Sequence, residues 1–170
     1  PLPNLRCLNL SYNTSTQSAS VFESSKGTLH RLFKLLPNLE QLKMAGFRHN
    51  GFSDHRRLAI SDNLPNLKDI DLSDWDHTTI QMSNLFNNHN GWGTKLERMC
   101  LSRSYYVSNI LIEHVAGFTT SLKHISIGES RNLSDLGQRR WFTKLESLQI
   151  IGEGALQRGA AAQYYHMQYP

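Results

Sequence analysis

Leucine and similar apolar residues recur along the chain in a fixed phrase, Leu-x-x-Leu-x-Leu, which occurs six times. The copies cover residues 5–10, 39–44, 67–72, 96–101, 122–127 and 145–150, with Met or Ile at some positions. Pro-Asn-Leu introduces three copies, beginning at Pro3, Pro37 and Pro65. Because positions one, four and six must point the same way, each phrase predicts a short strand entered through a bend. Repeated units of this kind bury their apolar faces against one another.

The segments between the phrases predict helices. The first leucines of successive phrases are 23 to 34 residues apart, which leaves room for a helix in most repeats. Helically spaced apolar residues occur in three segments: Leu29, Leu32, Phe33 and Leu36 in 28–36; Ile80, Met82, Leu85 and Phe86 in 80–86; and Ile110, Leu111 and Val115 in 109–115. Ser108 precedes the last of them as a cap. Segment 47–64 offers only Leu58 and Ile60 and predicts a short or irregular helix.

This pattern predicts an α/β fold, similar to the leucine-rich-repeat signature. We expect a solenoid of about six repeats over residues 1–151, with parallel strands on the concave side and helices or irregular turns on the convex side. Residues 152–170 lack the pattern and are interpreted as a tail or a short capping helix, with disorder as the alternative. A strand begins within a few residues of Pro1 without a capping segment, so we interpret the chain as part of a longer protein with incomplete caps.

The second position of the phrase alternates in charge through all six copies. Its residues are Arg6, Glu40, Lys68, Glu97, Lys123 and Glu146. In a parallel sheet they form one row in which every neighbouring pair has opposite charges. Such a row favours the correct register, because a slipped repeat would set like charges side by side. Chance among solvent-facing charges is the alternative.

Positions three, five and seven of each phrase face away from the leucines and predict a polar face on the sheet. Acidic residues of the third phrase adjoin arginines of the fourth, and Trp75, Tyr105 and Tyr106 would lie at the adjacent edge. We interpret this face as a binding surface for a protein partner, with the candidate residues Lys43, Asp69, Asp71, Asp74, Trp75, Arg98, Arg103, Tyr105, His124 and Gln149. The alternative is a salt-bridge cluster that satisfies its own charges on a solvated sheet.

Motifs for catalysis, metals or cofactors are not found, so an enzyme, a metal site and a cofactor are not expected. Residues 128–132 lack the closing glycine of a nucleophile elbow, and residues 91–95 lack the spacing of a phosphate loop. The eight histidines are scattered, without His-Glu-x-x-His or Cys-x-x-Cys. A basic cluster, Arg48, His49, His55, Arg56 and Arg57, is interpreted as a solvated loop rather than a phosphate site.

Charge and cysteine content indicate the compartment. The net charge of +4 permits an acidic partner but does not require nucleic acid, which is not expected as a ligand. No stretch has the roughly 20 apolar residues of a membrane span, and no secretory segment is seen. Cys7 and Cys100 lie on the first and fourth predicted strands, about 14 Å apart at ~4.8 Å per strand, so both are expected as free thiols. We predict a cytoplasmic or nuclear protein.

Two segments carry a closer resemblance. Residues 107–116, Val-Ser-Asn-Ile-Leu-Ile-Glu-His-Val-Ala, and residues 132–137, Asn-Leu-Ser-Asp-Leu-Gly, each precede a leucine phrase. They resemble the ribonuclease-inhibitor-like repeats of F-box proteins, in the cysteine-containing subclass, over about residues 65–150. The resemblance implies a region that holds substrates for a ubiquitin ligase, with a ligase adaptor as partner only if an F-box lies upstream. That subclass has cysteine at position nine, whereas the copies here carry Asn13, Phe47, Trp75, Ser104, Ser130 and Glu153.

Two other functions stay open. Residues 8–13 and 122–127 also resemble phrases from the sensor repeats of plant-type immune receptors. A different class is a basic adaptor associated with nucleic acid through the Arg48–Arg57 cluster. The identity of the protein partner is not encoded in any motif of the chain.

Overall fold

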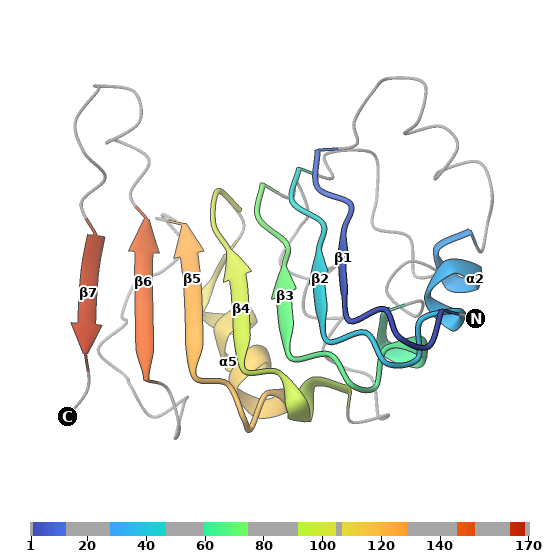
Figure 1. Cartoon of the computed structure of the whole chain (residues 1–170). Coiled ribbons are helices and arrows are strands. Elements are labelled where there is room, and N and C mark those ends of the chain that lie inside the picture. Colours follow the sequence, from blue (N-terminus) through green and yellow to red (C-terminus); the bar gives the residue numbers. More distant parts are fainter. Residues whose placement is uncertain are drawn as a thin grey trace.

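The leucine phrases form the strands of one sheet. The computed structural model describes residues 2–12, 28–46, 60–74, 92–104, 107–128, 146–151 and 164–168. The strands are β1 (Cys7–Asn9), β2 (Gln41–Lys43), β3 (Asp69–Asp71), β4 (Arg98–Leu101), β5 (His124–Gly128), β6 (Ser147–Ile151) and β7 (Tyr164–Gln168). They lie side by side in chain order (Figure 1). The pairings from β1 to β6 are all parallel, so the predicted α/β class with a parallel sheet is confirmed.

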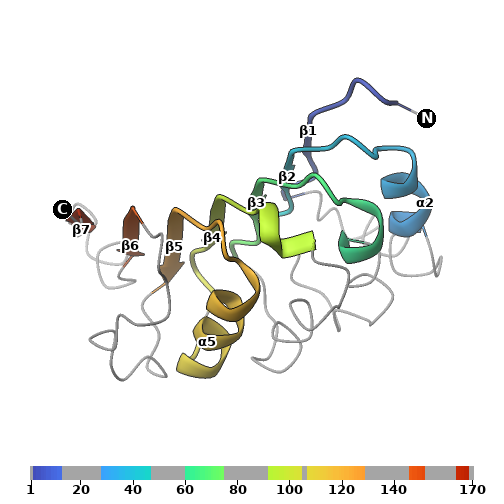
Figure 2. The ribbon, with the colours of Figure 1, turned by 90° about the horizontal axis from the view of Figure 1, so that it is seen from below.

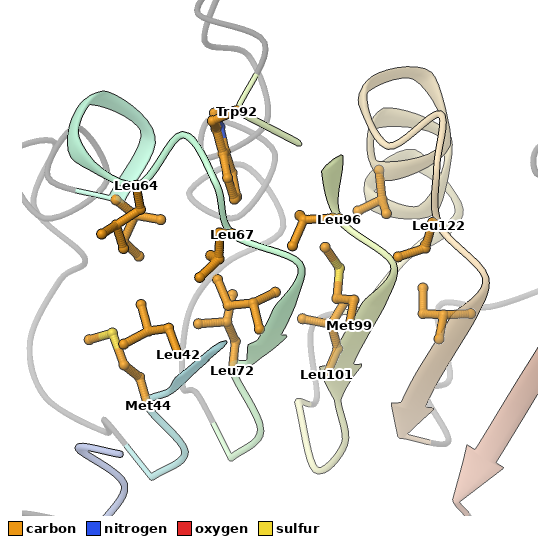
Figure 3. Packing of buried hydrophobic residues seen from close by; sticks show 14 of the residues in the cluster. Leu42, Met44, Leu64, Leu67, Leu72, Trp92, Leu96, Met99, Leu101 and Leu122 are labelled. Carbon is orange, nitrogen blue, oxygen red and sulfur yellow. The ribbon is translucent and has the colours of Figure 1, made fainter. Parts of the chain in front are cut away.

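The register of the sheet follows the phrase. The fourth positions of all six copies are consecutive Cα partners, in the order Leu8, Leu42, Ile70, Met99, Ile125 and Leu148. The apolar side chains of the second to fifth phrases are buried, with exposed fractions of 0 to 2%. Figure 3 shows them filling the layer between strands and helices, together with Trp92.

All helices in the described residues lie on one side of the sheet (Figure 2). They are α2 (Thr28–Lys34), a turn of helix at residues 60–63, the 3-10 helix η1 (Trp92–Lys95) and α5 (Asn109–Phe118). The predicted helices at 28–36 and 109–115 are therefore confirmed, and Ile60 is fully buried in the short helix of the 47–64 segment. Leu58 and the predicted helix at 80–86 lie outside the described residues.

Helix α5 differs from the prediction in which face it buries. Ser108 caps it as predicted, because the Leu111 amide donates to the Ser108 hydroxyl at 3.3 Å. Ile110, predicted to be buried, is instead 59% exposed, and Ile112 is buried beside Leu111. A helix of two or three turns offers several adjacent apolar faces, and packing against the common core decides which one is covered.

The same turn precedes each of the first five strands. The amide of the first leucine donates to the carbonyl three residues earlier, at 3.2 Å for Leu5, 3.1 Å for Leu39, 3.3 Å for Leu67, 3.1 Å for Leu96 and 3.1 Å for Leu122. In three of these turns the second residue is proline, whose fixed φ suits that position. This turn is the bend that the leucine spacing requires.

The asparagine of Pro-Asn-Leu joins consecutive turns. The Asn38 side chain donates to the Pro3 carbonyl at 3.0 Å, and the Asn66 side chain donates to the Pro37 carbonyl at 3.1 Å. In the fourth turn Lys95 replaces asparagine, and its Nζ donates to Asn66 Oδ1 at 2.7 Å. The triplet thus forms both the turn within one repeat and a contact between repeats.

A left-handed residue follows each of the first four strands. Tyr12, Gly46, Asp74 and Arg103, all at position eight of their phrases, have φ of 55°, 80°, 58° and 57°. Three of these residues donate through their amides to the carbonyl at position seven of the next repeat, at 2.7 to 2.9 Å. Only Gly46 adopts this conformation without a Cβ, and its backbone lies against the Tyr12 ring.

The C-terminal region differs from the helix or disorder considered for residues 152–170. Residues 164–168 form β7, which pairs antiparallel with β6. An added strand occupies the backbone groups along the outer edge of β6, which a short helix would leave unpaired. The composition of the segment, rich in Ala, Gln and Tyr, gave no alternation from which a strand was predicted.

Candidate functional site

The candidate site is the face of the sheet opposite the helices, here called the open face. It consists of positions three and five of the phrases, whose described residues are all exposed or partly exposed: Cys7, Asn9, Gln41, Lys43, Asp69, Asp71, Arg98, Cys100, His124, Ser126 and Ser147. None of the helices in the described part of the chain covers it (Figure 2). Position seven is buried in the second to fifth repeats, where its residues Ala45, Ser73, Ser102 and Gly128 are small. The open face is therefore polar and accessible along positions three and five.

The alternating charges at position two form one row along the start of the strands. Consecutive members are joined through the backbone, as in the Glu40 amide, which donates to the Arg6 carbonyl at 2.8 Å. Three of the five neighbouring pairs are also ion pairs, which are Arg6–Glu40 at 3.9 Å, Lys68–Glu40 at 2.8 Å and Lys123–Glu146 at 3.8 Å. The predicted row is confirmed, and Glu40 is its most strongly paired carboxylate.

Glu40 is also electrostatically distinct. The hydrogen bond from Lys68 and the positive charge of Lys68 hold the pKa of Glu40 below its ordinary value of 4.5, desolvation opposes them more weakly, and the charge of Arg6 makes the smallest contribution to the lowering. Its side chain is 34% exposed, so solvent screens these interactions. We therefore expect the row to contribute little to total stability, and its effect on alignment of the repeats stays a prediction.

At position three, one ion pair joins Arg98 to Asp69, and His124 contacts the neighbouring strand. Arg98 Nε donates to Asp69 Oδ2 at 3.1 Å across β4 and β3. His124 Nδ1 shares a 2.7 Å hydrogen bond with the Ser147 hydroxyl, and its Nε2 lies 3.8 Å from a Glu146 oxygen. The alternative of internal salt bridges thus applies to Asp69 and Arg98, while both side chains stay partly exposed.

At position five the charged side chains, Lys43 and Asp71, do not form an ion pair with each other. Lys43 is exposed and Asp71 is partly exposed, and the two are Cα partners in the pairing of β2 with β3. Asp71 Oδ1 accepts the Ser73 amide at 2.9 Å, and Asn9 Oδ1 accepts the Ser11 amide at the same distance. The bond from the Ser73 amide holds the Asp71 carboxylate at the end of β3. Within the described residues Lys43 forms no ion pair, so its charge faces outward.

A chain of hydroxyl and thiol groups joins the third, fourth and fifth repeats at the edge of the open face. Ser73 Oγ donates to Cys100 Sγ at 3.0 Å, Cys100 shares a 3.3 Å bond with Ser102, and Ser102 shares a 2.9 Å bond with Ser126. Sequence reasoning did not find this chain, although serine at position seven of successive phrases was a visible signal. Cys7 and Cys100 are both free thiols, as predicted.

The remaining candidate residues fall in three groups. Asp74 and Arg103 are the left-handed turn residues, and Asp74 is only 7% exposed, so it presents little surface to a partner. Gln149 lies on β6 as the Cα partner of Ser126. Its side chain is outside the described residues, as are Trp75 and Tyr105. The structure therefore brings together Lys43, Asp69, Asp71, Arg98 and His124 on one face.

No protein-family model matches the chain, and no curated protein matches it with significance. Among the described residues, no group of three or more His, Cys, Asp or Glu side chains is placed to hold a metal ion. No helix in the same part of the chain is both long and apolar enough to cross a membrane.

Proposed function

We propose that the chain is a leucine-rich-repeat solenoid of about six repeats that binds a protein partner on the open face of its sheet. One observation carries the proposal. Six parallel strands in matching register present accessible polar side chains on one side, while the described helices cover only the other side. The proposed role is binding rather than catalysis.

The repeated local structure supports the solenoid. The turn before the strand recurs in five copies with the same hydrogen bond, and a left-handed residue follows the strand in four, in three of which its amide donates to the next repeat. Each unit contacts its neighbours through the same positions, which is the organisation of a repeat array. A row of six strands spaced by ~4.8 Å spans about 24 Å, which is wide enough for one face of a protein interface.

The charges on the open face determine which side chains are expected to contact the partner. Lys43 and Asp71 are the strongest candidates, because their charged groups are accessible and take no part in an ion pair with each other. Arg98 and His124 extend this surface across β4 and β5. The face combines positive and negative charge, so we expect a partner surface of mixed charge, selected by complementarity.

A comparison of two charge-reversal variants tests the proposal. The open-face variant is Lys43→Glu with Arg98→Glu, and the matched control is Arg31→Glu with Lys34→Glu on α2. Proteins captured by the full chain from a cell extract are quantified by mass spectrometry. A partner is expected that the wild type and the α2 variant retain and that the open-face variant loses by about tenfold or more. Retention by the open-face variant together with loss by the α2 variant would contradict the proposal.

A more specific form of the proposal follows the resemblance of residues 107–116 and 132–137. In this form, the repeats present substrates to a ubiquitin ligase, and the adaptor is bound by an F-box encoded upstream. Sequencing the transcript upstream of Pro1 tests it. An F-box there would support the ligase role, whereas a nucleotide-binding domain there would favour the immune-receptor alternative. The basic cluster behind the nucleic-acid alternative lies outside the described residues.

A further inference from the structure

His124, on the open face, lies between a hydroxyl group and a carboxylate. Its Nδ1 shares a 2.7 Å hydrogen bond with the Ser147 hydroxyl, and its Nε2 lies 3.8 Å from Glu146 Oε2. His124 and Ser147 are Cα partners in the pairing of β5 with β6, and Glu146 directly precedes Ser147. A serine, an imidazole and a carboxylate in this order form the arrangement that activates a serine hydroxyl as a nucleophile.

The two ring nitrogens of His124 have different neighbours, which determine the role of each. The Glu146 carboxylate beside Nε2 favours the tautomer in which Nε2 carries the ring proton. Nδ1 is then an acceptor, and the Ser147 hydroxyl donates to it. Nδ1 is therefore placed to take the hydroxyl proton when Ser147 Oγ attacks an electrophile. Glu146 is 58% exposed and also lies 3.8 Å from Lys123, so it orients the ring only weakly.

Ser126 offers a comparison on the same face. It lies two residues after His124 on β5, and its hydroxyl shares a 2.9 Å hydrogen bond with the Ser102 hydroxyl. A serine hydroxyl is a very weak base, whereas an imidazole accepts a proton near neutral pH. Ser126 and Ser147 are both partly exposed, so access to solvent does not distinguish them. We therefore attribute any difference in their reactivity to His124.

The backbone around Ser147 limits the reactions that the hydroxyl can undergo. The amides of His124, Glu146 and Ser147 donate to carbonyls of the preceding repeat at 2.7 to 3.0 Å. These amides are not available to stabilise the negative charge that develops on a carbonyl oxygen during acyl transfer. Ser147 should therefore react only with acyl donors that have a good leaving group, and the ester that forms should be hydrolysed slowly. We expect one modification of the chain rather than turnover.

We propose that Ser147 is an acylation site, activated by His124, for small acyl donors with a good leaving group, such as aryl esters. Ser147 Oγ forms a bond to the acyl carbon, and its proton passes to His124 Nδ1. The bond from the acyl carbon to the phenolate oxygen breaks, and the phenolate leaves with the electron pair and takes up the proton from His124. The product is a serine ester and a phenol. This reactivity belongs to the chain alone, so it does not depend on the proposed binding of a partner.

Treatment of the full chain with p-nitrophenyl acetate at pH 8, followed by peptide mass spectrometry, tests the proposal. Acetylation of Ser147 is expected to be about tenfold or more faster than acetylation of Ser126 in the same sample. His124→Ala is expected to remove this advantage. His124→Gln keeps a hydrogen-bonding group beside Ser147 that cannot take its proton, and it should have the same effect. Added imidazole should restore the rate at Ser147 relative to Ser126 in the alanine variant, which it would not do if His124 only held the strands together.

Glu146 is a positioning residue, and its test is the tautomer of the His124 ring. Nitrogen-15 chemical shifts should place the ring proton on Nε2 in the wild type, and Glu146→Ala should move part of the population to Nδ1. Lys123→Ala is the matched control and should leave the tautomer unchanged. An unchanged tautomer in Glu146→Ala would overturn the role assigned to this carboxylate.

Three results would overturn the acylation site itself. The first is equal acetylation of Ser147 and Ser126, and the second is an unchanged ratio of the two rates in both His124 variants. The third is release of p-nitrophenol, lost in His124→Ala, without an ester on Ser147. In that case His124 would itself be the nucleophile, and Ser147 would only be its hydrogen-bond partner.

Discussion

Replacing the leucine at position four by alanine in two adjacent strands compares the stability of an enclosed site with that of a partly exposed one. Leu8 and Leu42 are Cα partners at position four of the first and second phrases. Leu42 is fully buried, whereas Leu8 is partly exposed. Leu42→Ala and Leu8→Ala therefore remove the same atoms from equivalent sites that differ mainly in their enclosure.

The expected losses follow from transfer and cavity terms. Removing the buried methyl and methylene groups of a leucine forfeits about 2 kcal/mol of transfer free energy, and an enclosed cavity adds to this. We expect Leu42→Ala to lower the free energy of unfolding by about 3 to 4 kcal/mol. Leu8→Ala leaves a space that opens to solvent, so its expected loss is about half as large.

Urea unfolding followed by far-ultraviolet circular dichroism and by tryptophan fluorescence measures both losses from the shift in midpoint. Trp92 is buried in the same core and reports on it. Coincident transitions from the two probes would justify a two-state treatment for each variant. Equal losses in the two variants would refute the reasoning, because they would mean that Leu8 is as enclosed as Leu42.

Three further predictions concern a charge, a cap and a turn. Because the pKa of Glu40 is lowered, its pairing with Lys68 should stabilise the fold above about pH 4.5 and be lost as the pH falls through the folded-state pKa. The difference in urea midpoint between wild type and Glu40→Gln should therefore shrink on acidification from pH 7 to pH 3, and a constant difference would count against it. Ser108→Ala should cost about 1 kcal/mol of unfolding free energy and Ser108→Gly only a few tenths, and equal losses would argue against a capping role. Gly46→Ala should cost more than about 1 kcal/mol, because its φ is positive and the added Cβ meets the Tyr12 ring. Calorimetry of the double variant with Tyr12→Ala should recover part of that cost, and strict additivity would show that the ring plays no part.

The parallel sheet followed from the sequence because the leucine spacing determines both the strand and its buried face. Each phrase places Leu42 or Ile70 toward the core by simple alternation, and identical phrases then pair in matching register. The charge row was visible for the same reason, since one position of a repeat maps to one row of the sheet. These features depend on local spacing, which a single sequence contains.

Other features depended on packing that local spacing does not encode. Helix α5 buries Ile112 and exposes Ile110, a choice between neighbouring apolar residues that depends on how the helix packs. The antiparallel β7 pairs with β6 through backbone groups, and its sequence carries no leucine phrase. At the candidate site, the residues of the open face were predicted by alternation. Asp74 is buried although Tyr12 and Arg103, which have the same left-handed conformation, are exposed, so its burial depends on its neighbours and could not be predicted from its position in the phrase.

Register between neighbouring repeats is the central structural claim, and the native Cys100 allows a direct measurement of it. Ser126 is the Cα partner of Cys100, whereas His124, two residues earlier on β5, is the partner of Arg98. Adjacent partners at ~4.8 Å suit a disulfide, and a displacement of two residues, about 6.6 Å along the strand, does not. With Cys7 replaced by serine, mild oxidation of Ser126→Cys should give an intramolecular disulfide with Cys100, detected by peptide mapping. The His124→Cys control should give none, and equal cross-linking in both variants, or cross-linking only in the control, would contradict the in-register array.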